Sequence, residues 1–313
     1  MDIKNLPTPA EIYSLFTNNI PEEAWPKAVD IVRRINPAYD FFLAKTAFDD
    51  VVRLFRGEYP GYCSIRTLYH DLPHTMDVFL CAVRLMHGVH ISGSRLSDNE
   101  MTIIMMAALM HDIGYAQRHG EETGTGAQFT QNHVNRGIEF MRRYIADKNF
   151  PPDLAASLEL MIQGTNYLVP FSEINFPDEH SRLLGQIVAT ADLTGQMADR
   201  TYLEKLLLLY MEFKEAGFGG YQNIHDMLGK TQKFYGSTKQ KLNGDFGGIY
   251  TKLSFHFNEL FGVDNNYYME SIEKNIAYLS KIILLDEEQH LSMLKRGGIV
   301  EKTRNMAAPD NSA

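Results

Sequence analysis

The sequence predicts an all-α protein built as a multi-helix bundle. Apolar residues recur at helical spacing along most of the chain, and no convincing pair of alternating strands is present. Residues 101–110 form an uncharged run of ten residues, rich in Met, Ala and Ile, whose length suits a buried helix better than a strand. We therefore expect a bundle organised around this helix, with functional residues at helix ends facing a common cavity.

Apolar periodicity and residues typical of helix ends predict the positions of the other helices. The helix within residues 21–35 is expected to start near Pro26, and Asp98 is the expected N-cap of the central helix. From Arg296 onward the sequence shows no periodicity, and we expect disorder there. Further helices are expected over residues 38–56, 75–89, 128–147, 154–162, 179–197, 202–216, 239–259 and 267–285.

Composition limits the classes of function. The chain has 313 residues, 44% hydrophobic and 22% charged, as in ordinary globular proteins. Its net charge of −9 argues against nucleic acid as a partner, while a small anionic substrate at a metal remains possible. The N-terminus lacks the apolar core of a signal peptide, and no apolar run is long enough to span a membrane. Two cysteines without CxxC spacing favour a reducing compartment. We expect a cytoplasmic protein without membrane contact.

Three segments place histidine or aspartate beside apolar runs. His111 and Asp112 end the central run, with Gly114 positioned to let the helix stop. Such a pair is costly to bury unless a metal ion compensates it, although His-Asp alone is more often a helix-terminal pair at an exposed corner. His70 and His74 would share a face if their turn is helical. Asp192 lies within another apolar run, where a lone Asp is more often a cap or an ion-pair partner.

Together these segments resemble the HD superfamily of metal-dependent phosphohydrolases, and most closely the class I cyclic-nucleotide phosphodiesterases. The segment 69–78 (YHDLPHTMDV) is similar to the phosphodiesterase motif YHN-x-x-H-x-x-DV, with Asp71 in place of Asn. Residues 107–112 (AALMHD) resemble the helix that ends in HD, and Asn132-His133 the Asn-His pair of the next helix. Residues 191–193 (ADL) and 210–217 (YMEFKEAG) complete a likeness that covers roughly residues 68–217.

The resemblance implies a site with two divalent metal ions, such as Mn, Mg, Fe or Zn. His74, His111, Asp112 and Asp192 would bind the first ion, and Asp112 would bridge to the second. A water between the ions, its pKa lowered by both, would attack phosphorus. His70 would act as the general acid on the leaving oxygen.

The resemblance also suggests supporting roles and a domain division. His133 would reach the second metal directly or through water, against the alternative of a surface histidine, and Asp77 would orient a ligand. Residues 1–60 would form a helical extension packed on the core, and residues 61–285 the HD phosphohydrolase domain. Residues 286–313 would form a C-terminal tail, disordered at its end.

The sequence departs from the phosphodiesterase pattern at the second metal. Tyr115 stands where that family has a histidine, and His119, Glu121 or Glu122 could substitute. The purine-binding glutamine and aromatic clamp are not identifiable by motif. The candidates for them are Gln232, Phe234, Gln240, Phe246 and Phe255.

The resulting prediction is a metal-dependent phosphohydrolase that acts on a small nucleotide or another phosphoester, foremost a 3′,5′-cyclic-nucleotide phosphodiesterase. A nucleotide phosphomonoesterase or alarmone hydrolase is the alternative within the superfamily, because a fold does not fix the substrate. A nucleotide-sensing binding module is the non-enzymatic alternative, which His70 disfavours because a sensor needs no acid beside its metals. The sequence leaves the oligomeric state open.

Overall fold

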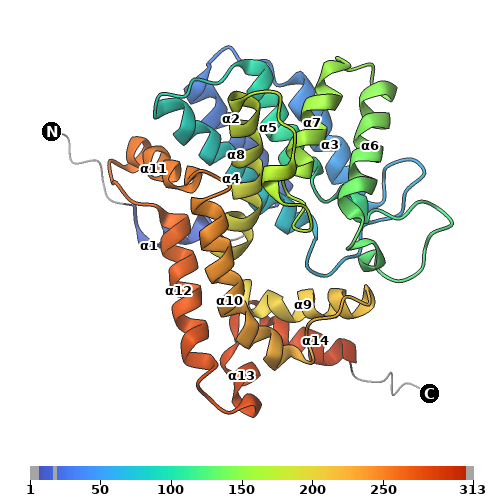
Figure 1. The fold of residues 1–313 in the computed structure, drawn as a ribbon, viewed down its shortest axis with the longest axis vertical. Helices are drawn as coiled ribbons and strands as arrows, with labels where there is room; N and C mark the ends of the chain where they lie inside the picture. The colour runs from blue at the N-terminus through green and yellow to red at the C-terminus, as the bar shows by residue number, and fades with distance from the viewer. Residues whose placement is uncertain (1–6, 17–19, 308–313) are drawn as a thin grey trace.

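The computed structural model describes residues 7–16 and 20–307 (Figure 1). Within these residues the chain forms fourteen α-helices and no strand, apart from an isolated antiparallel bridge between Tyr62 and Arg118. The predicted all-α class is confirmed.

The helices follow one another with short connections. In chain order they are α1 (Pro9–Ser14), α2 (Pro21–Ile35), α3 (Phe42–Arg56), α4 (Leu72–Ile91), α5 (Asp98–Met110), α6 (His133–Asp147), α7 (Asp153–Gln163), α8 (Glu179–Ala198), α9 (Tyr202–Glu215), α10 (Ile224–Asn243), α11 (Leu253–Phe261), α12 (Tyr267–Ile282), α13 (Glu287–Met293) and α14 (Ile299–Ala307). Short 3₁₀ turns include η1 (Ile113–Tyr115), η2 (Ala127–Phe129) and η4 (Ile249–Lys252).

Helix α5 lies in the middle of the larger part of the bundle (Figure 1). All its residues from Met101 to Met110 are buried, because α3, α4, α7 and α8 pack around it. A helix that is apolar on every side needs such surroundings to stay out of water. Helix α4 also packs along α8, which brings the start of α4, the end of α5 and the middle of α8 close together.

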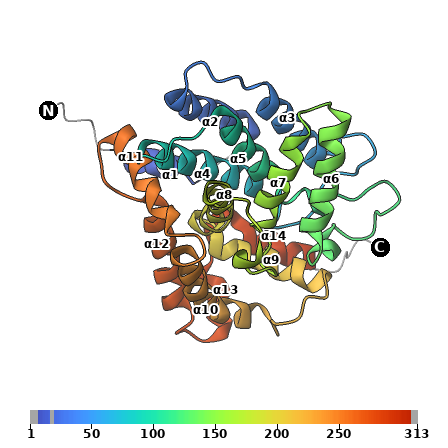
Figure 2. The ribbon, with the colours of Figure 1, turned by 45° about the horizontal axis from the view of Figure 1, so that its top comes forward.

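The C-terminal helices form the second part of the bundle. Helices α10 and α12 run side by side away from the α5 region, and α9, α13 and α14 gather near their far ends (Figures 1 and 2). Helix α9 packs against α10 and α14 and also contacts η2. The cavity described below lies where α9 and α10 face α8.

Several predicted helix boundaries were wrong. Helix α2 begins at Pro21 and carries Pro26 inside it, within its second turn. Ser97 is the N-cap of α5, because its hydroxyl and the carboxylate of Glu100 form a capping box. The helix expected over residues 239–259 is interrupted: α10 ends at Asn243, and the chain turns at Gly247-Gly248, both at positive φ, before η4 and α11.

The disorder predicted from Arg296 onward was also wrong. Residues 299–307 form α14, whose Val300 and Thr303 are buried and which packs on α9. The backbone N–H of Arg296 donates to Glu204, and its guanidinium donates to the carbonyl of Arg200. These contacts hold the segment on α9. Residues 308–313 lie outside the described residues.

The expected N-terminal extension shares its core with the rest of the chain. Helix α2 packs on α4 and α3 packs on α5, and one continuous hydrophobic core includes residues from Phe16 to Val300. The boundary at residues 60 and 61 stays a prediction. No helix in the described part of the chain is both long and apolar enough to cross a bilayer.

Candidate metal centre

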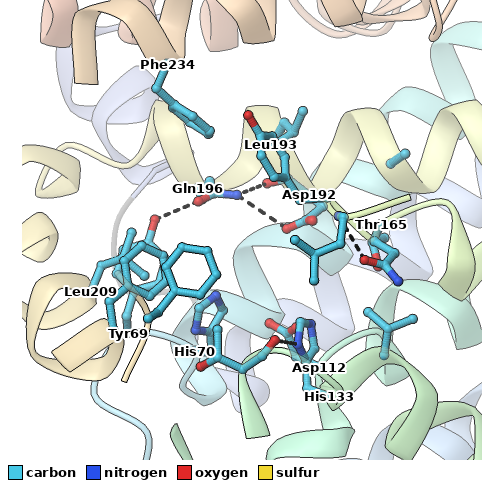
Figure 3. Close-up of a pocket in the computed structure, with 18 of the residues that line it drawn as sticks. Tyr69, His70, Asp112, His133, Thr165, Asp192, Leu193, Gln196, Leu209 and Phe234 are labelled. Carbon is cyan, nitrogen blue, oxygen red and sulfur yellow. Dashed lines mark hydrogen bonds and ion pairs between the residues drawn. The ribbon is translucent and has the colours of Figure 1, made fainter. Parts of the chain in front are cut away.

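The predicted ligands come from three helix ends and one helix interior, and three of them, Asp112, His133 and Asp192, line one cavity (Figure 3). His74 lies in the first turn of α4, His111 is the C-cap of α5, and Asp112 follows it. Asp192 lies in the middle of α8, and His133 begins α6. These residues are buried or half-buried, and the structure brings all of them together.

Four ligand atoms converge as a first metal site requires. The Nε2 atom of His111 lies 3.0 Å from Asp112 Oδ2 and 3.4 Å from His74 Nε2, and His74 Nε2 lies 3.3 Å from the same oxygen. Asp192 Oδ1 lies 3.7 Å from both Nε2 atoms. Ligands about 2.0–2.2 Å from one cation are separated by distances of this size, so His74, His111 and Asp112 can enclose a single ion, with Asp192 Oδ1 beside the two histidines.

The other carboxylate oxygen of Asp112 faces a different partner. Its Oδ1 lies 3.5 Å from His133 Nε2, whereas Oδ2 faces His74 and His111. One carboxylate therefore presents one oxygen to a pair of imidazole nitrogens and its other oxygen to a third. This is the arrangement that a carboxylate bridging two cations needs.

Hydrogen bonds fix the ring orientation of two of the histidines. The Nδ1 of His111 lies 2.9 Å from the carbonyl oxygen of Ala108, and the Nδ1 of His133 lies 2.7 Å from that of Thr130. A carbonyl only accepts, so Nδ1 carries the proton in both rings and donates it. Nε2 is then the nitrogen of each ring that faces Asp112 and that a bound cation would take as its ligand, as in the ligand histidines of metalloproteins.

Buried charges shift the pKa values of these groups. Burial alone would lower the pKa of His111, but the carboxylates of Asp112 and Asp192 raise it to about 9. Burial would raise the pKa of Asp112, but His111 and His70 hold it well below its usual range. Burial lowers the pKa of His133. The site is thus a buried anionic centre that attracts protons in the absence of another cation.

A buried atom of Asp112 tests whether the residues fit a metal. Its Oδ2 is buried, and no described residue donates a well-aligned hydrogen bond to it, although two imidazole nitrogens lie close by. An unsatisfied buried carboxylate oxygen is costly unless a cation compensates it. His74, His111 and Asp112 can each offer a ligand atom within 4.8 Å of the others. The nitrogen and oxygen donors suit Mn, Fe, Zn or Mg.

The start of α4 explains the spacing of its motif. Asp71 is the N-cap, and its carboxylate accepts the backbone N–H of His74 at 2.9 Å. Asp and Asn are both good N-caps, so Asp71 can replace the Asn of the phosphodiesterase motif. The helix starts at Leu72, three residues before the expected position, and Pro73 fits its first turn. His70 precedes the helix, so the condition under which it would share a helical face with His74 is not met.

Gly114 has a different role from the expected one. Its φ is not positive, and α5 has already ended at Met110. A Cβ at residue 114 would lie 1.7 Å from the carbonyl oxygen of His133 and 2.7 Å from the backbone nitrogen of Gly137. Gly114 therefore allows α6 to approach η1 closely enough to place His133 beside Asp112.

His70 faces the ligands and is held by a residue that sequence reasoning missed. Its Nδ1 lies 2.7 Å from Oε2 of Glu212, whose other oxygen accepts the backbone N–H groups of Tyr69 and His70. Burial would lower the pKa of His70, but Glu212 and Asp112 raise it to about 9. Glu212 is 1% exposed although it lies on an amphipathic helix, and a glutamate among Leu206, Leu209 and Phe213 gave no signal for this role.

Gln196 was also missed. The hydroxyl of Tyr69 donates to its Oε1 at 2.7 Å, and its Nε2 donates to the backbone carbonyl of Asp192 at 3.2 Å and, more weakly, to the carboxylate (Figure 3). Gln196 follows Asp192 by one helical turn, so it joins α8 to the segment that precedes α4. Asp77 is half-buried within the electrostatic reach of Lys205, and its orienting role stays a prediction.

Tyr115, which stands where the phosphodiesterase pattern has a histidine, makes packing contacts with two histidines. Its ring stacks on His70 and on His133, with centroids 4.8 Å and 4.6 Å apart. Burial raises the pKa of its hydroxyl well above the usual value, so it stays neutral. The suggested substitutes point elsewhere: Glu121 pairs with Arg136, Glu122 accepts from the backbone of Gly120, and exposed His119 does not line the cavity.

A cavity of about 260 Å³ opens from the ligand cluster between α8, α9 and α10. Its wall is rich in aromatic rings, and two of the five proposed base-binding residues, Phe234 and Phe246, belong to it. The other three do not line it. Gln232 donates to Ser280 instead, Phe255 is an exposed residue of α11, and Gln240 is exposed on α10.

Comparison with known proteins adds one partial match. The profile of a family described as Npun_R2479-like matches residues 118–243, less than half of the chain. This segment carries His133, Asp192 and Glu212, and it begins after His111 and Asp112. That family description names no activity. No curated protein matches the chain.

Proposed function

We propose that the protein is a metal-dependent phosphohydrolase. The observation that carries the proposal is the convergence of His74, His111, Asp112 and Asp192 from three segments far apart in sequence, with Asp112 and Asp192 lining one cavity. Imidazole nitrogens and carboxylate oxygens gathered at one buried point are the ligands that divalent cations take in proteins.

The chain's own residues suit phosphoester hydrolysis. Divalent ions held by this cluster would supply an activated water and neutralise phosphoryl oxygens. Asp112 would hold two of them through its separate oxygens, and His133 would belong to the second group of ligands. Tyr115 covers one side of His133 and limits its movement. The apolar rings of the cavity would exclude bulk water from the phosphoester.

His70 is the proposed general acid. Glu212 binds Nδ1 and stabilises the charged imidazolium, so Nε2 keeps a proton to donate to the leaving oxygen. His70 lies next to the ligand cluster without belonging to it: its ring centroid is 5.6 Å from that of His74. Acid and ligands thus flank the position that a phosphorus atom would occupy.

The proposed substrate is a phosphodiester, foremost a 3′,5′-cyclic nucleotide. The phosphodiesterase-like segment 69–78 supports this class, and the aromatic wall of the cavity can accept a flat base. A monoester would bring a further negative charge to a neighbourhood already containing Asp71, Asp77, Asp112 and Asp192, which modestly favours a diester.

One panel tests this proposal. The purified protein, dialysed against manganese or magnesium, is assayed on cyclic nucleotides, linear phosphodiesters, phosphomonoesters and pyrophosphates. We expect metal-dependent turnover of cyclic nucleotides that is lost in Asp192→Asn and kept in His119→Ala, an exposed histidine outside the cavity. Efficient monoester or pyrophosphate cleavage alone would reject the diester class, and no turnover of any substrate with either metal would reject the hydrolase.

A further inference from the structure

A single lysine faces the cavity that opens from the ligand cluster. Among the described residues, Lys241 is the only Lys or Arg that lines this cavity. It lies near the C-terminal end of α10, seven residues after Phe234, so the two side chains leave the same face of the helix. Figure 3 shows Phe234 across the cavity from Asp112 and His133. Lys241 also borders a shallow groove with Pro170 and Ser237, which places it toward the surface.

The ammonium group of Lys241 rests on aromatic rings. Its Nζ lies 5.2 Å from the ring centroid of Tyr167 and 5.7 Å from that of Phe246. Within the described chain it makes no ion pair and donates no hydrogen bond. Asp245 and Asp192 attract it only from a distance, and burial lowers its pKa. Cation–π contacts orient the group while leaving its N–H donors available.

A lysine near a helix C-terminus has an ordinary explanation, because it complements the helix dipole. That explanation predicts a solvated ammonium or one bonded to the last carbonyls. Lys241 instead turns its ammonium group toward two rings of the cavity wall. Its half-buried position gives a charged partner a stronger interaction than a fully exposed lysine would have.

We propose that Lys241 recognises an anionic group of the substrate at the outer end of the cavity. This inference rests on the proposed function, in which the phosphoester occupies the ligand cluster at the inner end. Within the proposed phosphoester class, this inference favours a substrate whose flat body lies among Tyr167, Phe234 and Phe246 and which carries a second acidic group on the side away from the scissile bond. An unmodified 3′,5′-cyclic nucleotide lacks such a group, so the inference narrows the phosphoester class beyond the proposed function.

Two non-hydrolysable probes of the same shape test the charge preference. Para-carboxybenzylphosphonate and para-carbamoylbenzylphosphonate differ in one negative charge, and each carries a phosphonate for the metal cluster. Their dissociation constants are measured by calorimetry with the manganese-loaded full chain, for wild type, Lys241→Gln and Lys241→Arg. Omitting manganese gives the metal dependence, and thermal unfolding verifies that both variants are folded.

We expect the wild type to bind the carboxylate probe about tenfold more tightly than the amide. The preference should fall below about twofold in Lys241→Gln, persist in Lys241→Arg, and weaken with added salt. Metal-dependent but equal binding of both probes, or an unchanged preference in Lys241→Gln, overturns the role of Lys241 and leaves the hydrolase proposal standing. Failure of both probes to bind the wild type in a metal-dependent way overturns both proposals.

Discussion

Glu212 Oε2 lies 2.7 Å from His70 Nδ1, across 142 positions of sequence. The same side chain accepts the backbone N–H groups of Tyr69 and His70, so one buried carboxylate fixes both the position and the charge of the imidazole. A hydrogen bond to a buried ion is stronger than one between neutral groups. His70 is therefore held as a charged donor, whereas burial lowers the pKa of His133.

Glu212→Gln should narrow the range of pH over which the enzyme is active, by lowering its upper limit. Glu212 raises the pKa of His70, and a general acid works only while it is protonated. Without this carboxylate the pKa of His70 falls, so the basic limb of kcat against pH should move to lower pH while metal content stays the same. Glu215→Gln is the matched control on α9, because Glu215 bonds Thr125 at an exposed position. An unshifted basic limb would mean that Glu212 serves only the backbone.

His70→Ala should lower turnover on the natural substrate by about 10²–10⁴ without loss of metal. The loss should be much smaller for a nitrophenyl ester, whose leaving group needs no proton. The measurement is kcat on both substrates, together with elemental analysis. Equal losses on both substrates would assign His70 to metal binding or to structure.

His111→Ala and Asp192→Ala should each remove most of the bound metal. Each variant deletes one member of a buried ligand set whose atoms lie within 3.7 Å of His74 Nε2. Metal content is measured by elemental analysis after dialysis against manganese and then buffer. His119→Ala is the control for loss of an exposed histidine, and wild-type metal content in both ligand variants would refute the assignment.

Gly114→Ala should destabilise the fold and disturb His133. The added Cβ would overlap the carbonyl oxygen of His133, and backbone cannot move aside as a flexible side chain does. We expect a loss of about 3 kcal/mol in the free energy of unfolding, the upper part of the usual range for overpacking. Denaturant unfolding measures it. Gly229→Ala on α10, where no atom lies within 4 Å of the new Cβ, should be neutral or stabilising by up to about 1 kcal/mol.

The His87–His256 pair between α4 and α11 should make the protein acid-sensitive. Burial first, and then the charges of Arg84, His87 and Arg34, hold the pKa of His256 well below its usual value. The unfolded chain then binds a proton near pH 6.5 that the folded chain does not, so stability is present above about pH 6.5 and is lost as the pH falls.

Unfolding free energies of wild type and His256→Gln between pH 7.5 and 5 test this. The wild type should lose up to about 1.4 kcal/mol per pH unit more than the variant. Comparing the two removes the contribution of the histidines at the ligand cluster, because both proteins carry them. Parallel curves would show that His256 takes up its proton in the folded state.

Periodic segments made most of the fold predictable. The charge-free run of α5 and the apolar stripes of α6 and α8 identify helices because burial on one or all sides imposes that pattern. The prediction of one helix over residues 239–259 was wrong because Gly247-Gly248 interrupts a composition that otherwise suits a helix. Helix α14 was not predicted because only Val300 and Thr303, among its described side chains, are buried against α9. Two buried residues are too few to produce a periodic signal in the sequence.

The candidate ligands could be proposed from the sequence because their histidines and aspartates follow a motif. Glu212 and Gln196 were not, because their roles depend on partners that only tertiary packing brings near. A glutamate on an amphipathic helix ordinarily faces solvent. Gly114 was predicted to end the helix, but glycine is required there because a side chain would overlap the backbone of His133. No local sequence pattern encodes this close approach. The roles of the ligands stay predictions until metal is measured.

The spacing of the ligands along the chain also sets an order of assembly. His74, His111 and Asp112 belong to α4 and the end of α5, whereas Asp192 follows 80 residues after Asp112, on α8. During synthesis the first three emerge together, and a cation captured then would lack its fourth protein ligand. Docking of α8 on α4 closes the set, and α9 brings Glu212 to His70 only afterwards. The four proposed ligands are thus complete in a nascent chain before the residue that holds the proposed general acid in place.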